Sequence, residues 1–489
     1  MNGLEHPRNG RTAYHFQPAK FWQNDPNGPL YHNGMYHFFY QYNPHGATWG
    51  DGTLSWGHSV SGDLVNWADV GNALDPTSPF DANGCWSGSA TVLPGGRPAI
   101  LYTGIDANRV QVQNVAFAKN PADPLLREWE KPDCNPVMPM PADVTGNNFR
   151  DPTEAWLGRD GLWRVGVVAE VGGVGSLLVY RSADFLRWER NAAPLHASSR
   201  DVPVLECPDL FPMAPPGAAE GLDVSASGAG VLHVLKLTDF AKEDHYMVGR
   251  YDDVEDTFVS AEPERGDDPD GKRLVQWPIE EIETLRRKRV GLQWATEVEA
   301  GGRKEVAGIV SSQADVQAVF EIPNLEEAET LDPKWLQDPK GLAAEMGASG
   351  RGGVGPFGLL VLASGDLEEH TAVFFRVFKH DGKFKVLMCT DLTRSSRKEG
   401  INKPSYGAFL DVDVEKERSI SLRTLIDHTV VESFGDGGRA CMTARVYPEH
   451  AATGSSRLYA FNYGAGAVKV SKLEAWELAT AAVNGGGHF

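Results

Sequence analysis

Three short segments each hold a carboxylate beside residues that shape the backbone, and together they could cleave a glycosidic bond. They are Asn24-Asp25-Pro26-Asn27-Gly28, Arg150-Asp151-Pro152 and Glu206-Cys207-Pro208-Asp209. In a retaining glycosidase one carboxylate attacks the anomeric carbon and a second carboxyl protonates the leaving oxygen, with roughly 5–5.5 Å between the two groups. For each segment taken alone, a structural role as a turn cap or an ion-pair partner is the alternative.

The neighbours of each carboxylate indicate how it would act. Pro26 favours an extended backbone at Asp25. Arg150 is expected to keep Asp151 ionised, because a nearby positive charge favours the carboxylate form. Glu206 lies among apolar residues, so we expect partial burial that raises its pKa and suits it to act as a general acid.

A repeat of about sixty residues relates these segments to one another. Asp63, Asp123 and Asp184 each lie in a turn-like segment that ends in Trp, at intervals of 60 and 61 residues. A fourth copy is expected at Asp244. Such self-similarity at a fixed period is typical of repeat architectures.

Four polar positions share one phase of this repeat, because each precedes a successive aspartate by 33 to 38 residues: Asp25, Ser87 in Trp86-Ser87-Gly88-Ser89, Asp151 and Glu206. Short strand-like runs, bounded by Gly, Pro, Asn and Asp, precede each copy. Units of four strands repeated in this way are typical of propeller blades. Since the first strand of each blade lines the central channel, the phase predicts one axial pocket that contains all four residues.

From about residue 303 onward, strand-like runs at close spacing predict a β-sandwich. We therefore expect an all-β chain with three parts: a β-propeller catalytic domain at 1–275, a hinge with a short helix at 276–302, and a C-terminal sandwich at 303–489.

Composition favours a small neutral molecule as the partner. The chain has 46 basic and 66 acidic residues and a net charge of −20, whereas nucleic acids and anionic membranes require a basic face. No apolar run reaches the length of a membrane helix, and the first residues lack the apolar core of a signal peptide. Neither a metal-binding pair nor a phosphate-binding loop is found, so no metal site is expected.

The chain has five cysteines, which is too few for a disulfide scaffold. Cys389 and Cys441 lie in segments expected to be neighbouring strands, so we expect a disulfide between them, with two buried free thiols as the alternative.

Taken together, the carboxylate segments resemble the signature motifs of glycoside hydrolase family 32. His15-Phe16-Gln17-Pro18 with Trp22–Gly28 is similar to the nucleophile motif, Phe149–Pro152 to the transition-state-stabiliser motif, and Glu206–Asp209 to the acid/base motif. The resemblance continues through Leu422–His428 and Val431–Gly435 and so covers nearly the whole chain. Pro208 is similar to the plant cell-wall invertases and fructan exohydrolases.

The resemblance implies a five-bladed β-propeller followed by a β-sandwich, and a retaining hydrolase that releases the terminal β-D-fructofuranosyl residue of sucrose without a cofactor. It implies Asp25 as nucleophile, Glu206 as acid/base, and Asp151 as a ligand of the fructosyl hydroxyls in the transition state. The implied substrate-binding positions are Asn24, Gln41, Trp49, Trp86, Ser87 and Arg150. By resemblance the protein would be extracellular, in the cell wall or apoplast.

The sequence also departs from the family pattern. Leu205 stands where the family usually has Trp, and Gln23 replaces a usual Met. The repeat predicts a fifth blade that ends near residue 305, yet the hinge begins at Gln276 after a polar run. One blade is therefore expected to be truncated by very roughly 40–60 residues. The alternatives to an invertase are a fructan exohydrolase and a catalytically impaired sugar-binding or regulatory homologue.

Overall fold

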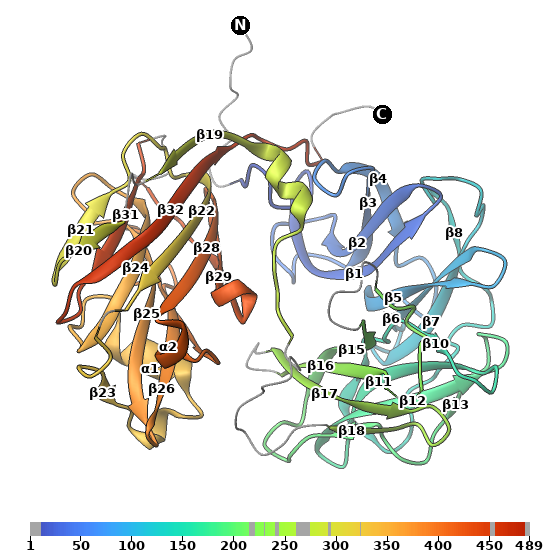
Figure 1. The fold of residues 1–489 in the computed structure, drawn as a ribbon. Coiled ribbons are helices and arrows are strands. Elements are labelled where there is room, and N and C mark those ends of the chain that lie inside the picture. The colour runs from blue at the N-terminus through green and yellow to red at the C-terminus, as the bar shows by residue number, and fades with distance from the viewer. Residues whose placement is uncertain are drawn as a thin grey trace, which may run out of the picture. The chain divides into compact units, whose positions relative to one another are not determined.

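The computed structural model describes residues 11–214, 221–228, 230–239, 244–260, 274–291, 295–322, 324–449 and 455–484. The chain divides into two compact units (Figure 1). The first, called here the propeller unit, is Gln17–Lys272 with Ala482–Phe489, and the second, the sandwich unit, is Met1–Phe16 with Arg273–Ala481. None of the described helices is both long and apolar enough to cross a membrane.

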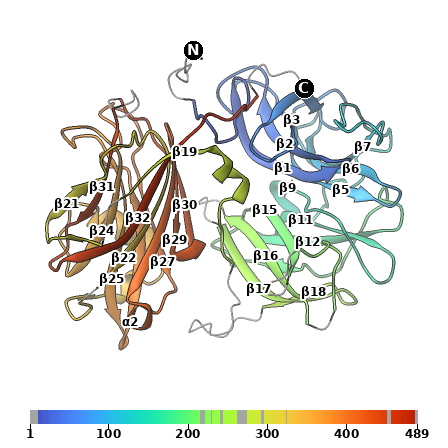
Figure 2. The same cartoon turned by 45° about the horizontal axis from the view of Figure 1, so that its top comes forward.

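The propeller unit consists of four antiparallel sheets, each built mainly from strands in chain order (Figure 2). The first sheet has β1 (Trp22–His32), β2 (Met35–Asn43), β3 (Ser55–Ser61) and β4 (Ala68–Leu74); the second has β5 (Cys85–Leu93), β6 (Arg97–Ile105), β7 (Gln111–Ala118) and β8 (Trp129–Glu130). The third has β9 (Val144–Arg150), β10 (Trp156–Leu157), β11 (Trp163–Val171), β12 (Val174–Ser182), β13 (Glu189–Arg190) and β14 (His196–Ala197); the fourth has β15 (Leu205–Met213), β16 (Leu232–Asp239), β17 (Asp244–Asp252) and β18 (Thr257–Ser260).

Each sheet is one blade, so the described residues form four blades, and the five implied by the family resemblance is corrected to four. The described strands that follow β18, namely β19 (Arg286–Gly291) and β20 (Thr296–Val298), pair with a strand of the sandwich unit and add nothing to a fifth blade. The all-β architecture of a propeller followed by a sandwich is confirmed.

The repeated aspartates close the same turn in three blades. Backbone N–H groups two and three residues ahead donate to Asp63 and to Asp184, and Asp123 accepts from Leu125 N at 3.1 Å. In each turn the indole N–H of the terminal Trp donates to a backbone carbonyl three residues earlier. The fourth copy expected at Asp244 is wrong, because Asp244 begins β17 and the corresponding turn uses Asp252, which accepts from Val254 N and Glu255 N.

The sandwich unit has two seven-stranded sheets around one apolar core. One sheet contains β19, β20, β22 (Gln313–Glu321), β28 (Ser419–Asp427), β29 (Val430–Gly435), β30 (Ala440–Arg445) and β32 (Val468–Leu478). The other contains β21 (Gly302–Glu305), β23 (Glu329–Thr330), β24 (Val354–Ala363), β25 (Thr371–His380), β26 (Lys383–Asp391), β27 (Ser405–Leu410) and β31 (Arg457–Asn462). The described helices are α1 (Pro339–Met346), α2 (Val414–Glu417) and three short 3₁₀ turns at Glu280–Leu285, Pro333–Trp335 and Asp436–Gly438.

The expected disulfide between Cys389 and Cys441 is wrong, since both are free thiols. Cys389 lies in β26 and Cys441 in β30, which belong to different sheets. Successive side chains of a strand point to opposite faces. Met388 and Met442 point into the core between the sheets, so the adjacent cysteines point out of it, away from one another.

An N-terminal segment is fastened to the sandwich unit by a single buried carboxylate. Asp427, at the end of β28, accepts hydrogen bonds from the backbone N–H of Ala13 at 2.6 Å, Tyr14 at 2.8 Å and His15 at 2.8 Å. The imidazole of His15 contacts Asp427 at 3.0 Å and Glu432 at 3.5 Å. Two motifs at opposite ends of the sequence thus form one charged cluster.

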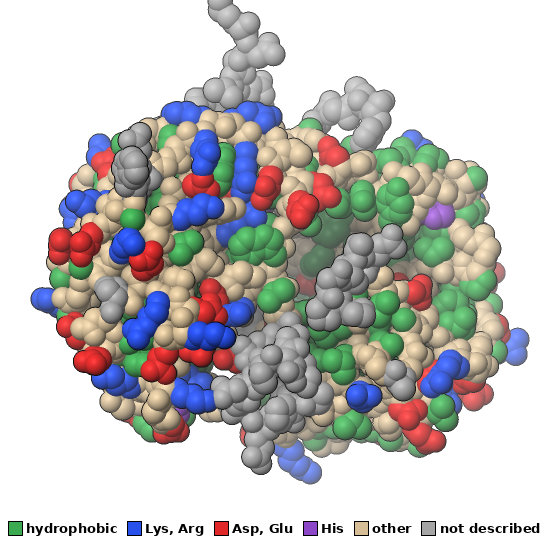
Figure 3. Space-filling model, in the orientation of Figure 1, with side chains coloured by type: hydrophobic (Ala, Val, Ile, Leu, Met, Phe, Trp, Pro, Cys, Tyr) green, Lys and Arg blue, Asp and Glu red, His purple; other side chains and the backbone are tan. Residues whose placement is uncertain are grey.

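Charges of both signs are spread over the surface of the sandwich unit. Figure 3 shows basic and acidic side chains interspersed over the face of that unit that it draws. The net charge of −20 is therefore not gathered into one acidic patch on this face.

Candidate active site

The innermost strands of three blades each contain a β-bulge at the predicted site. A bulge sets two residues opposite one on the neighbouring strand, bends the strand and re-aims its side chains. The bulges place Asn24 and Asp25 opposite Gln41, Trp86 and Ser87 opposite Thr103, and Cys207 and Pro208 opposite Leu237. A β-bulge thus recurs at each of these three polar segments, and the sequence motifs did not predict the bulges.

Asp25 lies against the second blade. The hydroxyl of Ser87, in β5, donates to Asp25 Oδ2 at 2.7 Å, which joins the two innermost strands. The backbone of Gly28 approaches β5 so closely that an added Cβ would lie 2.8 Å from Ala90 Cβ, and Gly28 has a φ of +43°. Glycine is therefore required at this position, for both space and conformation.

Arg150 connects the third and fourth blades. Its guanidinium donates to Glu206 Oε1 at 3.1 Å and to Asn148 Oδ1 at 2.9 Å, and its Nε lies 3.9 Å from Asp151 Oδ2. The Arg150 side chain is 8% exposed and that of Glu206 is 23% exposed. Partial burial of Glu206 was expected, and its remaining exposure leaves room for a ligand to reach it.

Cys207 links the carboxylates to one another. Its backbone N–H donates to Asp151 Oδ2 at 3.0 Å, and its thiol lies 3.9 Å from Asp25 Oδ2. Burial raises the pKa of this thiol well above its usual range, and the negative charges of Asp151 and Asp25 act in the same direction. The sulfur therefore remains a protonated, weak donor toward Asp25.

Asp151 has an unusual backbone and an unusual charge state. It has a φ of +56°, and Cys207 has a φ of +46°, in the left-handed region that non-glycine residues rarely adopt. Burial raises the pKa of Asp151 to about 6, although Arg150 and the Cys207 N–H favour its ionised form. Arg150 favours the ionised form as expected, but burial and the charges of Asp25 and Glu206 outweigh it, so Asp151 is ionised mainly above about pH 6.

The remaining predicted substrate-binding residues lie in the first two blades. Asn24 Oδ1 accepts from the Trp22 indole at 2.9 Å, and Gln41 Nε2 donates to the carbonyl of Cys85 at 3.0 Å. The rings of Trp49 and Trp86 meet edge to face with centroids 5.7 Å apart, and Trp49 is 49% exposed. An exposed aromatic pair of this kind presents apolar faces that a sugar ring can contact.

Two residues that contact the proposed site were not predicted from the sequence. Thr103 accepts the backbone N–H of Asp151 at 2.9 Å, and Cys207 forms the links described above. The Thr103 contact joins residues 48 positions apart, and no motif marks it. The Glu-Cys-Pro-Asp segment could have drawn attention to Cys207, because it adjoins the predicted acid.

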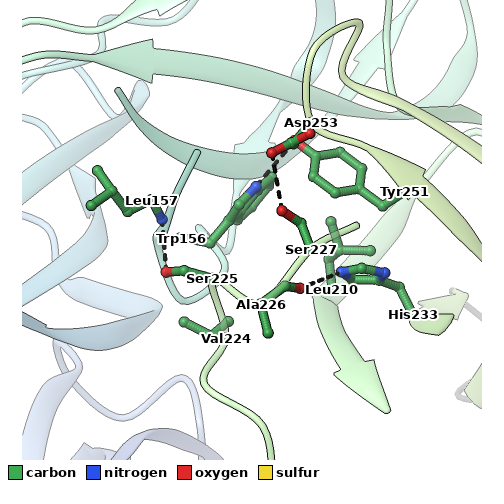
Figure 4. A pocket seen from close by; sticks show the side chains of 10 residues that line it. All are labelled: Trp156, Leu157, Leu210, Val224, Ser225, Ala226, Ser227, His233, Tyr251 and Asp253. Atoms are coloured by element: carbon green, nitrogen blue, oxygen red, sulfur yellow. Dashed lines mark hydrogen bonds between the residues drawn. The ribbon is translucent and has the colours of Figure 1, made fainter. Parts of the chain in front are cut away.

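A crevice in the seam between the third and fourth blades is closed by packing contacts. Figure 4 shows Trp156, Tyr251, Ser227 and Asp253 turned toward one another there. The Trp156 indole donates to the Tyr251 hydroxyl at 3.1 Å, and Ser227 donates to Asp253 at 3.0 Å. The crevice leaves about 0 Å³ for a ligand, so these contacts serve to pack the blades.

The geometry brings Asp25, Asp151 and Glu206 from three different blades into one connected group of contacts. Within the described residues, no cluster of three His, Cys, Asp or Glu side chains is arranged to hold a metal ion. A carboxylate fixed by a hydroxyl and a second, partly exposed carboxyl fixed by a guanidinium together have the parts that a double-displacement glycosidase requires.

Two family profiles match nearly the whole chain. The profile "Glycosyl hydrolases family 32 N-terminal domain" matches residues 15–299, and "Glycosyl hydrolases family 32 C terminal" matches residues 281–477.

Individual proteins also match over most of their length. "Beta-fructofuranosidase, insoluble isoenzyme 5" of Oryza sativa subsp. japonica is 68% identical, covering 99% of this chain and 93% of the relative. "Fructan 6-exohydrolase" of Triticum aestivum is 58% identical, covering 97% and 91%. The crystal structure of fructan 1-exohydrolase IIa from Cichorium intybus has a TM-score of 0.91 at 42% identity and covers 97% of this chain and 98% of that chain.

Proposed function

The chain belongs to glycosyl hydrolases family 32, and from that membership we propose that it is a β-fructofuranosidase that hydrolyses the terminal fructosyl residue of sucrose. The observation that carries this proposal is the contact group of Asp25, Asp151 and Glu206, which come from the first, third and fourth blades. The identity of 68% to a named β-fructofuranosidase supports the same assignment.

In the first step Asp25 acts as the nucleophile. One of its carboxylate oxygens attacks the anomeric carbon of the fructosyl group, and the bond from that carbon to the glycosidic oxygen breaks. Glu206 gives its proton to the departing oxygen, so glucose leaves with its hydroxyl restored and Glu206 is left as a carboxylate. Ser87 holds Asp25 in place through the 2.7 Å hydrogen bond.

In the second step the covalent fructosyl–Asp25 ester is hydrolysed. Glu206, now a carboxylate, takes a proton from water while the water oxygen attacks the anomeric carbon. The ester bond breaks, Asp25 returns to its ionised form and fructose leaves with its original configuration. Two inversions at one carbon give net retention.

Asp151 and Arg150 orient the reacting groups. We assign Asp151 to the fructosyl hydroxyls, because a carboxyl with a pKa of about 6 accepts hydrogen bonds and, where it is protonated at more acidic pH, also donates one. Arg150 fixes Glu206 through the 3.1 Å contact. The aromatic pair Trp49 and Trp86 would contact the sugar rings.

The test is substitution of the two reacting carboxylates in the full chain, with glucose release from sucrose as the readout. Asp25→Ala should abolish turnover, and Glu206→Gln should lower kcat at least about a thousandfold because proton transfer is lost. Asp201→Asn removes an exposed carboxylate five residues before Glu206 and serves as the matched control. Wild-type rates in Asp25→Ala would refute the assignment.

A fructan exohydrolase is the second candidate. It is favoured by the 58% identity to a fructan 6-exohydrolase and by the TM-score of 0.91 to a fructan 1-exohydrolase. The two candidates share the same chemistry and differ in the leaving group. Comparing kcat/KM on sucrose, 1-kestose, inulin and levan distinguishes them, since an invertase should cleave sucrose most efficiently.

We also propose a location in the cell wall, because rice relatives carry the name "insoluble" isoenzymes. Expression of the natural gene product in its own tissue, followed by wall fractionation with and without high salt, tests this location. Recovery only in the low-salt soluble fraction would contradict it.

A further inference from the structure

The sandwich unit contains an open cavity that takes no part in the chemistry above. Its volume is about 440 Å³, which lies in the range of small-molecule sites. Arg303 in β21, His370 before β25, Asp391 at the end of β26 and Tyr463 after β31 line it. All of these residues belong to the sandwich unit, whereas the three carboxylates belong to the propeller unit.

Three arginines from separate segments line this cavity: Arg303, Arg351 and Arg394. All three are exposed, and in the described part of the chain none forms an ion pair or donates a side-chain hydrogen bond. Other arginines of the same unit, such as Arg286 and Arg423, are paired with carboxylates. Like charges that share one concavity repel each other unless an anion neutralises them.

Asp391 is the one carboxylate in the lining, and among the described residues it forms no ion pair with these arginines. Asp391 Oδ2 accepts the backbone N–H of Ala348 at 2.8 Å, and Oδ1 accepts that of Thr393 at 2.9 Å and the hydroxyl of Ser405 at 3.4 Å. Its oxygens are therefore engaged in holding the surrounding loops. The guanidinium groups remain available to a ligand from outside.

Hydrogen bonds to backbone carbonyls anchor the loops that carry Arg351 and Arg394. Buried Arg376 donates to the carbonyls of Gly347 at 2.8 Å and Gly350 at 2.6 Å, directly before Arg351. The backbone N–H of His370 donates to the carbonyl of Arg394 at 2.8 Å. Because the walls are anchored before any ligand arrives, binding would require little ordering of the backbone.

His370 contributes no additional charge near neutral pH. Burial lowers its pKa, and the positive charges of Arg394 and Arg303 act in the same direction. The contact of its Nδ1 with the carbonyl of Leu367 at 3.0 Å and the charge of Asp391 oppose this shift without reversing it. The positive potential of the cavity thus comes from the arginines. The half-buried ring of Tyr463 supplies an apolar wall beside them.

We propose that this cavity binds a sugar-sized ligand that carries an oxyanion, either the carboxylate of a uronic acid or the phosphate of a sugar phosphate. The planar guanidinium fork matches both groups with paired hydrogen bonds, which a neutral sugar cannot use as fully. The aromatic wall suits a sugar ring. This site is independent of the proposed fructosidase activity.

The test is titration calorimetry on the full chain at constant ionic strength, with galacturonic acid, glucose 6-phosphate, inorganic phosphate, and glucose as the neutral comparison. At least one of the three anions should bind, and glucose should bind at least about tenfold more weakly because one charged hydrogen bond changes affinity by about that factor. Binding of galacturonate alone identifies a uronate site, and binding of both phosphates identifies a phosphate site. Failure of all three anions to bind overturns the proposal.

Variants connect the binding to the cavity. The triple variant Arg303→Gln, Arg351→Gln, Arg394→Gln keeps the side-chain stems and should abolish binding, and Arg351→Gln alone should weaken it about tenfold. Arg187→Gln removes one charge from the propeller unit, where that side chain is 92% exposed, and should bind as the wild type does. Sucrose turnover reports that each variant is folded. Equal weakening in Arg187→Gln and Arg351→Gln, or unchanged binding in the triple variant, also overturns the proposal.

Discussion

The guanidinium of Arg150 lies 3.1 Å from Glu206 Oε1 and thereby connects the end of β9 to the beginning of β15 in the next blade. Arg150 is also the residue whose charge most favours the ionised form of Asp151. Arg150 therefore positions Glu206, the proposed acid/base, and favours the ionised form of Asp151.

Replacing Arg150 should lower kcat/KM, and the loss should be larger when the new side chain can form fewer of its hydrogen bonds. Arg150→Lys keeps the charge but not the fork that reaches both Glu206 and Asn148, so we expect kcat/KM to fall about tenfold; Arg150→Gln should cost about a hundredfold. Steady-state kinetics on sucrose measures both. If Arg150→Lys keeps the wild-type kcat/KM while Arg150→Gln loses it, the charge alone decides and the positional role is refuted.

Removing the hydroxyl that fixes the proposed nucleophile should slow the covalent step. Ser87→Ala deletes the 2.7 Å donor to Asp25 and should lower kcat about tenfold, with a smaller effect on KM. Ser176→Ala removes another buried hydroxyl, one that donates only to the carbonyl of Val174, and is the matched control. A kcat for Ser87→Ala within twofold of the wild type would show that the contact is dispensable.

Asp151 should destabilise the fold when it is ionised. Its pKa of about 6 in the folded chain exceeds the ordinary value of 3.8, so folding favours the protonated form. The cost of ionisation develops as pH rises from about 4 to about 6 and is fully present above 6. Asp151→Asn should therefore be more stable than the wild type at pH 7, by about 2–3 kcal/mol, and similar to it near pH 3.5.

Urea unfolding at the two pH values measures this difference, and sucrose turnover is expected to be lost at both. The reverse order, with a larger stability gain at the lower pH, would contradict the assigned charge state.

The cluster of His15, Asp427 and Glu432 should make stability fall in alkaline solution. Burial alone would lower the pKa of His15, but hydrogen bonds to Asp427 and Glu432 outweigh it and raise the pKa to about 9. The stabilisation is fully present below the ordinary value of 6.5 and is lost as pH rises through 9. His15→Gln should therefore reduce stability at pH 6 by up to about 3 kcal/mol and have little effect at pH 10.

Chemical unfolding at both pH values checks this prediction. The control is His45→Gln, which changes an exposed histidine of the propeller unit. An effect of His15→Gln that stays constant from pH 6 to pH 10 would exclude the ionic role.

The sandwich should contain no disulfide. All five cysteines are free thiols, and Cys389 and Cys441 point out of opposite sheets. Alkylation of the denatured chain without reductant should therefore label five thiols, and intact mass reports the count directly. Labelling of only three thiols would show that the chain contains a disulfide, as was expected from the sequence.

Local chemistry explains what could be predicted about the fold. The turns at Asp63 and Asp184 depend on contacts within a few residues, so their repetition was visible in the sequence. Asp244 was misplaced because the fourth repeat is longer than the other three, and spacing alone could not show which aspartate closes its turn. The resemblance implied five blades and the early hinge predicted that one of them is truncated, but only the pairing of β19 and β20 with β32 showed that the described strands form four.

The sequence by itself determined which residues are proposed to carry the chemistry, because Asp25, Asp151 and Glu206 stand in motifs whose phase and neighbours are local properties. The tertiary structure alone decided how they are linked: Cys207 between Asp151 and Asp25, Thr103 on the backbone of Asp151, and Arg150 on Glu206. It also decided that burial outweighs the adjacent Arg150 at Asp151. Contacts between distant residues and the exclusion of water depend on how blades pack, and no short segment of sequence contains that information.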